Sequence, residues 1–73
     1  MMEERIYRIL YEIRPDSDFK HSKDFIKEGL LDSIDIMELF LQLEEEFNVS
    51  IDFENVEFEN IASIDGILSL IGK

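Results

Sequence analysis

The sequence predicts an all-α fold: a small antiparallel four-helix bundle with three longer helices, one short helix and a long first loop. Apolar residues recur at helical spacing in three segments, and alternation typical of a strand is confined to residues 49–53. Of the 73 residues, 45% are hydrophobic, which is enough for a core and argues against disorder. We therefore expect residues 1–73 to form a single domain.

The first helix is predicted over residues 2–14, and a loop over residues 15–31 follows it. Pro15 disfavours a helical conformation of Arg14 and so ends the helix, where a late arginine also suits the helix dipole. The loop has no clear period, and its length in so small a domain is typical of functional loops. Within it we expect at most a short helical turn near residues 22–27. The stripe of the first helix consists of Ile6, Ile9, Leu10 and Ile13, and the residues expected to pin the loop are Phe19, Phe25, Ile26, Leu30 and Leu31.

The clearest helix is predicted over residues 33–48, which contain good helix formers and end at Asn48, a suitable C-cap. A short helix is expected over residues 53–58, with Asp52 as its N-cap.

The last helix is predicted over residues 63–71, with Ser63 as its N-cap. Gly66 is expected to weaken this helix, because glycine has a low helix propensity. Its apolar stripe consists of Ile64, Ile67, Leu68 and Ile71.

The helix over residues 33–48 carries two separate apolar faces when its residues are placed about 100° apart around the axis. A globular helix needs only one buried face. Either the long loop folds over the second face, or that face is a partner-binding patch whose acidic rim steers a basic partner. The core face consists of Ile36, Leu39, Phe40, Leu43 and Phe47, and the second face of Ile34, Met37 and Leu41, edged by Glu38, Glu44 and Glu45.

The net charge is −11, and it is distributed unevenly. Residues 1–31 hold seven acidic and six basic side chains, whereas residues 32–73 hold eleven acidic side chains and only one basic one, Lys73. Nucleic acid and anionic membranes would be repelled, so basic protein surfaces are the favoured partners. No apolar run approaches the roughly 20 residues of a membrane span, and the charged start does not resemble a signal peptide. The sequence therefore predicts a cytoplasmic protein without membrane insertion.

Several kinds of chemistry are disfavoured by the residue types present. The chain has no cysteine, which excludes disulfides and thiolate metal sites. Its acidic pairs lack the spacing and central glycine of a calcium-binding EF-hand loop, so no metal site is expected. A nucleophilic serine needs a nearby base, and His21, the only histidine, lies in a polar loop. We expect no enzymatic activity.

Residues 29–36, Gly-Leu-Leu-Asp-Ser-Ile-Asp-Ile, place one hydroxyl at the start of the clearest helix. Serine is a preferred N-cap, and on spacing alone Ser33 is best read as the cap. The capping box would then want Glu or Gln at position 36, where Ile36 stands. The alternative is that Asp32 is the cap, with Asp35 in the first turn, which would leave the Ser33 hydroxyl free for an attached group.

This segment resembles the acyl carrier protein family. The run from Gly29 to Asp35 is followed by Met37-Glu38-Leu39 and by Leu43-Glu44-Glu45-Glu46-Phe47 at the family's spacing. The resemblance extends over nearly the whole chain, including Asp24-Phe25 in the first loop and Ile51-Asp52 after the helix. Asp-Ser-hydrophobe alone is a weak signal, but joined to the two glutamate-rich patterns it is a specific one.

The resemblance implies that Ser33 carries 4′-phosphopantetheine, derived from coenzyme A, through a phosphodiester. The thiol of this arm holds acyl or aminoacyl groups as thioesters, so that the protein itself does no chemistry. It implies as partners a phosphopantetheinyl transferase, an adenylating or other loading enzyme and downstream acyl-processing enzymes, with the carrier as a monomer. The residues matching the family's partner-binding positions are Asp32, Ile34, Asp35, Met37, Glu38, Leu41, Glu44 and Glu45.

One departure suggests a branch of the family. Carriers of fatty-acid synthesis usually have Gly-x-Asp-Ser, whereas this chain has Leu30 and Leu31 between the glycine and the aspartate, as D-alanyl carriers and stand-alone carriers of specialised pathways do. Fatty-acid, polyketide or nonribosomal-peptide synthesis and cell-wall modification all remain open. Phe40 crowds the core, and we hypothesise that little room is left for a long acyl chain. The alternatives from other classes are an unmodified acidic adaptor that binds a basic protein through residues 34–45, and a calcium-responsive helical protein.

Overall fold

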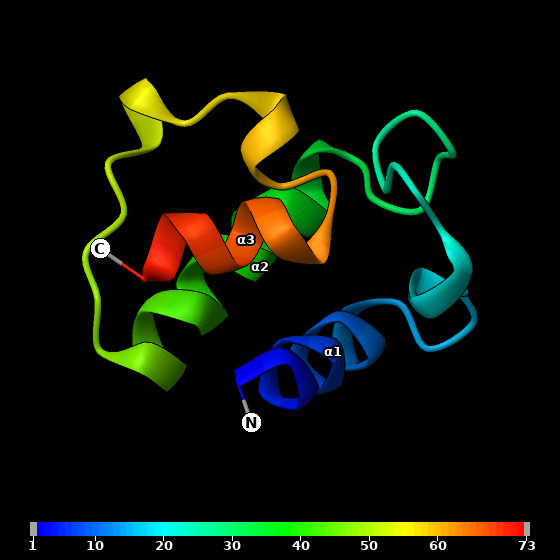
Figure 1. The fold of residues 1–73 in the computed structure, drawn as a ribbon, viewed down its shortest axis with the longest axis horizontal. Coiled ribbons are helices and arrows are strands. Elements are labelled where there is room, and N and C mark those ends of the chain that lie inside the picture. Colours follow the sequence, from blue (N-terminus) through cyan, green and yellow to red (C-terminus); the bar gives the residue numbers. More distant parts are fainter. Residues whose placement is uncertain (1, 73) are drawn as a thin grey trace.

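The computed structural model describes residues 2–72, and their regular structure is entirely helical. There are three α-helices, α1 (Met2–Ile13), α2 (Ser33–Phe47) and α3 (Ile64–Ile71). One 3₁₀ turn, η1 (Phe19–His21), lies between α1 and α2, and two, η2 (Phe53–Asn55) and η3 (Phe58–Asn60), lie between α2 and α3. The two long connections, residues 14–32 and 48–63, lie at opposite ends of the view in Figure 1. The all-α prediction is confirmed, and the bounds of the three long helices agree with the predicted ones to within one residue.

The short fourth helix expected over residues 53–58 is not confirmed, because two 3₁₀ turns stand in its place. Asp52 caps η2 as predicted, since its side chain accepts a hydrogen bond from the Glu54 N–H. Val56 then adopts an extended conformation, which ends the turn. The Asn60 side chain accepts from the Glu57 N–H at 2.9 Å and closes η3 locally. Side chains that bond to nearby backbone compete with a continuous helix in this way.

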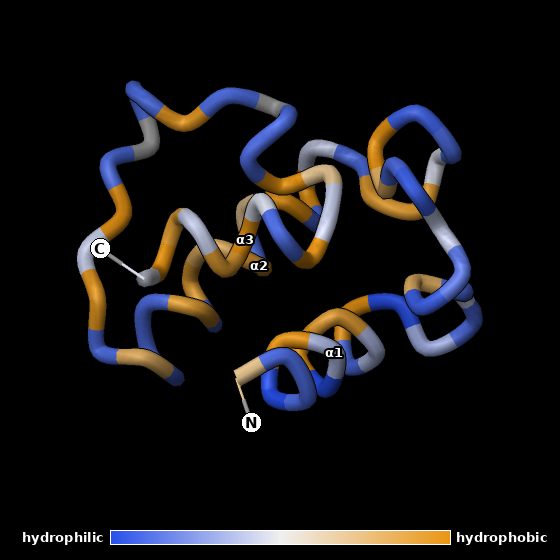
Figure 2. Tube along the Cα trace, viewed as in Figure 1, coloured by the Kyte–Doolittle hydropathy of each residue, from blue (hydrophilic) through white to orange (hydrophobic). Residues whose placement is uncertain are grey.

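The core is built from the predicted apolar stripes. Hydrophobic residues recur among hydrophilic ones along the helices, as expected for helices with a buried side (Figure 2). The core face of α2 is the predicted one, and the first loop contributes aromatic rings that pack edge to face, with Phe19 and Phe25 centroids 5.2 Å apart. The buried core residues include Ile6, Ile9, Leu10, Phe19, Phe25, Leu31, Ile36, Leu39, Phe40, Leu43, Ile61, Ile67 and Ile71.

The first loop is held in place by backbone bonds as well as by its aromatic rings. Asp24 accepts from the N–H groups of Ile26 and Lys27 and starts a turn over residues 25–29, which overlaps the turn expected near 22–27. Gly29 has a φ of 76°, a conformation that glycine adopts without strain. The Phe25 N–H donates to the Ala62 carbonyl at 2.7 Å, which ties this loop to the residues just before α3.

Helices α1 and α2 run antiparallel and are joined at both ends by the three arginines of the chain. Near the start of α1, Arg5 and Arg8 reach Glu46 at the end of α2, with N···O distances of 2.7 and 3.3 Å. Beyond the end of α1, Arg14 reaches Asp32 and Asp35 at the start of α2. These contacts place the α2 N-terminus, and Ser33 with it, beside the C-terminus of α1.

Gly66 is needed for the packing of α3 against η3, although glycine is a poor helix former. A Cβ atom at this position would lie 2.7 Å from the Asn60 carbonyl oxygen and 2.8 Å from that of Glu59. Both atoms belong to the backbone of η3, so a side chain here would force η3 away from α3. Glycine at position 66 permits this close approach, and Ser63 caps α3 as predicted by accepting from the Gly66 N–H at 3.1 Å.

Candidate functional site

Ser33 is the first residue of α2 and its side chain is exposed. The prediction that Ser33 itself caps the helix is wrong, because Asp32 is the cap. Asp32 Oδ1 accepts from the Asp35 N–H at 2.9 Å, and Asp35 Oδ2 accepts from the Asp32 N–H at 3.1 Å. This is a capping box with an aspartate three residues on, in place of the glutamate that usually takes that role. It leaves the Ser33 hydroxyl without a hydrogen-bond partner among the described residues.

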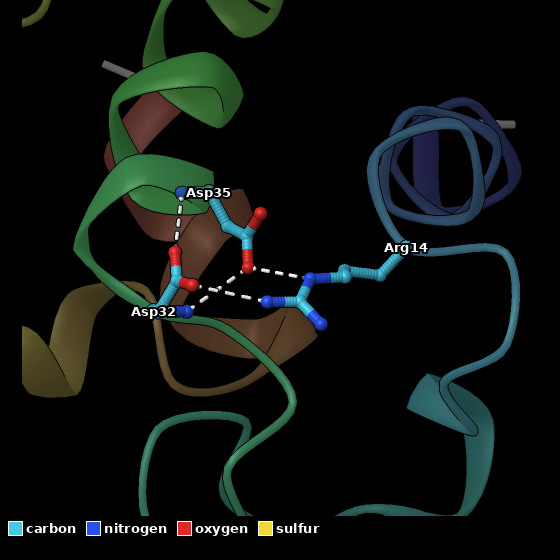
Figure 3. A network of polar contacts seen from close by, with 3 residues as sticks. All are labelled: Arg14, Asp32 and Asp35. Carbon is cyan, nitrogen blue, oxygen red and sulfur yellow. Dashed lines mark hydrogen bonds and ion pairs between the residues drawn. The ribbon is translucent and has the colours of Figure 1, made fainter.

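Arg14 completes a network around this helix start (Figure 3). Its Nε donates to Asp35 Oδ2 at 2.7 Å, and its Nη2 donates to Asp32 Oδ2 at 3.0 Å. The Asp35 side chain is only 13% exposed, whereas those of Asp32 and Arg14 are 57% and 43% exposed. One guanidinium therefore bridges the two carboxylates that flank Ser33.

The network also shifts the pKa values of Asp32 and Arg14. The hydrogen bond from the Asp35 N–H, with the nearby Arg14 charge in support, holds the pKa of the Asp32 carboxyl below its usual value. The hydrogen bond and charge of Asp35, followed by the charge of Asp32, raise the pKa of Arg14. Sequence reasoning missed this role of Arg14, which it assigned only to the helix dipole. The only signal available was an arginine at a helix end in a chain rich in acids.

The second apolar face of α2 is open to solvent. Ile34 is 78% exposed, Met37 56% and Leu41 54%, and we call these three residues the exposed stripe. The alternative that the first loop folds over them is wrong, because Phe19, Phe25 and Leu31 of that loop pack into the core instead. Large apolar side chains exposed side by side on one helix face commonly mark an interaction site.

The acidic residues predicted around this stripe are in different bonding states. Glu38 and Glu45 are exposed, and Glu38 accepts from the Gln42 amide at 3.1 Å. Glu44 is half-buried, and its carboxylate accepts from the Ile51 N–H at 2.8 Å, which holds the chain as it leaves α2. Asp32 and Asp35 are paired with Arg14. Of the five acidic residues at the predicted partner-binding positions, Glu38 and Glu45 are thus the two that form no ion pair or backbone bond among the described residues.

Other chemistry has little support in the described part of the chain. His21 lies in η1, is exposed and pairs with Asp18, whose Oδ2 is 2.8 Å from its Nδ1. No group of three or more histidine, aspartate or glutamate side chains among residues 2–72 is arranged to hold a metal ion. In the same range, no helix has the length and hydropathy needed to cross a membrane.

Comparison with protein families gives a match over most of the chain. Residues 4–70 match the family model described as a phosphopantetheine attachment site. Comparisons with curated proteins and with solved structures returned no match. The matched range covers nearly the whole chain and includes α2, the Arg14 network and the exposed stripe.

Proposed function

The chain belongs to the family defined by the phosphopantetheine attachment site, and we propose that Ser33 is the residue to which its 4′-phosphopantetheine is joined. The observation that carries this proposal is the free hydroxyl of Ser33, exposed at the start of α2 while Asp32 performs the capping. A serine that caps its own helix would have its oxygen engaged with the backbone. Here the oxygen is available to attack the diphosphate of coenzyme A, forming the phosphodiester and releasing the nucleotide.

The surroundings of Ser33 fit a phosphodiester. The first turn of α2 has backbone N–H groups without helical partners and the positive end of the helix dipole, both of which favour an anion. Asp32 and Asp35 repel an added phosphate, so we expect the arm to point outward, and Arg14 offsets part of that repulsion. The bound arm supplies a thiol, which this cysteine-free chain lacks.

We propose that the protein is a cytoplasmic carrier and that this domain has no catalytic activity of its own. It holds an acyl or aminoacyl group as a thioester and presents it to other proteins. Its partners would be a phosphopantetheinyl transferase, a loading enzyme of the adenylating class and enzymes that process the cargo further. The exposed stripe, with Glu38 and Glu45 beside it, offers these enzymes a surface with an apolar centre and a negative margin.

The test of attachment uses coenzyme A and a promiscuous phosphopantetheinyl transferase. Intact-protein mass spectrometry should show one phosphopantetheine adduct on the wild type and none on Ser33→Ala. Ser50→Ala is the matched control, because Ser50 is also exposed but lies outside the helix start, and this variant should be modified normally. A folded wild-type protein that several transferases leave unmodified would instead favour the acidic adaptor, which binds through the same helix face.

The packing of the core bears on the size of the cargo. Leu39, Leu43 and Ile67 are fully buried and Phe40 nearly so, which supports a short acyl or aminoacyl cargo held outside the bundle. Carriers loaded with medium and long acyl groups should therefore melt at the same temperature as the unloaded form. A melting temperature that rises with chain length would show that the bundle encloses the chain, and would contradict this part of the proposal.

A further inference from the structure

The two carboxylates next to the attachment serine are already occupied within the chain. Arg14 is bound to both of them, through Nε to Asp35 and through Nη2 to Asp32. A guanidinium presents its N–H groups in a fixed plane, so it can bridge two carboxylates where a lysine ammonium would not hold the same geometry. The pairing joins α1 to α2 across a separation of 21 residues in the sequence, from Arg14 to Asp35.

Farther along α2, Glu46 is paired with Arg5 and Arg8, whereas Glu38 and Glu45 form no ion pair among the described residues. Glu38 and Glu45 line a groove with Glu12 of α1, and the one cation in its lining, Arg8, is paired with Glu46. Glu38 and Glu45 also lie on the edge of the exposed stripe. The unpaired carboxylates beside the exposed stripe are therefore those of Glu38 and Glu45, which lie farther along α2 than the serine.

We propose that Arg14 is a specificity-determining residue: it acts as an internal counter-ion that withholds Asp32 and Asp35 from partner enzymes. A basic partner surface then docks on the exposed stripe with Glu38 and Glu45, and it gains no ion pair beside Ser33 unless it displaces Arg14. Partners whose basic side chains sit nearest their active site are disfavoured by this arrangement, and those whose basic side chains lie farther away are favoured. The inference rests on the proposed attachment at Ser33, and it names the charge pattern of the partner.

The opposing explanation is that Arg14 only clamps the two helices. The two explanations predict opposite changes in partner binding when the arginine is removed. If Arg14 only holds the two helices together, its removal would loosen the start of α2. The KM of an enzyme that acts on Ser33 would then rise or stay unchanged. If Arg14 acts as a counter-ion, its removal would expose the carboxylates of Asp32 and Asp35 and lower that KM, even though the fold becomes less stable.

The experiment measures transfer of phosphopantetheine to the unmodified protein by a promiscuous transferase with a basic carrier-binding surface. Arg14→Gln is compared with Lys23→Gln, which removes the same unit of charge from an exposed position in the first loop. Exposed ion pairs contribute modestly to binding, so unmasking should lower the KM for the carrier by about 1.5- to fivefold. We expect kcat to stay unchanged, the Lys23→Gln values to match the wild type, and the difference to shrink at high salt.

The outcomes distinguish a failure of the inference about Arg14 from a failure of the proposed attachment at Ser33. A KM that is equal to or higher than that of Lys23→Gln overturns the role of Arg14 while leaving attachment at Ser33 intact. A wild type that acquires no adduct overturns the attachment and this inference with it. If Arg14→Gln does not fold, Arg14→Lys decides, since an ammonium can engage only one carboxylate well. Its KM should fall below that of the wild type, and a KM that is unchanged or raised contradicts the inference.

Discussion

Replacing Gly66 with alanine sets helix propensity against tertiary packing. In an isolated helix this change would stabilise α3 by about 1 kcal/mol, because alanine is the better helix former. In the structure the new Cβ would lie 2.7 Å from the Asn60 carbonyl oxygen, 2.8 Å from the Glu59 carbonyl oxygen and 2.9 Å from the Asn60 carbonyl carbon. All three atoms are backbone, so no side chain can rotate away to relieve the overlap.

The balance of the two effects gives the expected size of the change. Overpacking costs about 1–3 kcal/mol, and we expect the upper part of that range because a backbone segment must shift. After the gain in propensity, Gly66→Ala should lose a net ~1–2 kcal/mol. For a domain of this size that corresponds to a melting temperature lower by roughly 5–15 °C.

The assay is urea unfolding followed by far-ultraviolet circular dichroism, with a thermal melt on the same samples. Ser69→Ala is the control in the same helix, because Ser69 is exposed and its replacement changes propensity alone. That variant should gain a few tenths of a kcal/mol, about the propensity difference between serine and alanine. If Gly66→Ala is as stable as the wild type or more so, η3 does not pack tightly on α3 in solution, and the reasoning is refuted.

Three further predictions test the two faces of α2 and the electrostatics. Met37→Arg, on the exposed stripe, should change stability by less than about 0.5 kcal/mol, whereas Leu39→Ala, in the core, should lose about 2–5 kcal/mol; urea unfolding checks both, and a Met37→Arg protein that unfolds would show that the face is core. The pKa of Asp32 is depressed in the fold, so its stabilisation is present above the usual value of 3.8 and is lost as the pH falls through the lower folded value. Asp32→Asn keeps a capping side chain and should flatten this acid dependence, whereas an unchanged acid slope in melts between neutral pH and pH ~3 would contradict the assignment. Added magnesium should raise the melting temperature by screening the net charge of −11, and a melt unaffected by magnesium would count against self-repulsion.

The features that sequence reasoning predicted correctly depend on residues close together in the chain. The spacing of apolar residues predicted α1, α2 and α3, and the caps Asp52 and Ser63 lie where their side chains can reach the next turn. The two faces of α2 follow from its period alone, so the exposed stripe was visible before the structure. A match to the family of phosphopantetheine attachment sites agrees with the resemblance drawn from the residues around Ser33.

The errors concern places where several local solutions compete. Residues 53–58 can form a short helix, but Val56 is extended and the Asn60 side chain closes a separate turn. At the start of α2 both Asp32 and Ser33 are good caps, and spacing alone favoured the serine. The aspartate is the cap in the structure because Asp35 returns the hydrogen bond and Arg14 binds both carboxylates. Neither choice could be made from propensities, since these differ too little between the competing residues.

Composition and periodicity alone identify an acidic, cysteine-free, helical chain in which Ser33 lies at the start of a helix with two apolar faces. The folded chain was needed to show that the Ser33 hydroxyl has no partner among the described residues and that Arg14 binds both Asp32 and Asp35. It was also needed to show that α3 approaches η3 too closely for a side chain at position 66. The difference comes from how far apart in the sequence the interacting residues are. Periodicity and capping act within one or two turns and leave a pattern in the sequence, whereas the ion pairs and the close approach join segments whose distance is set by the packing of the whole core.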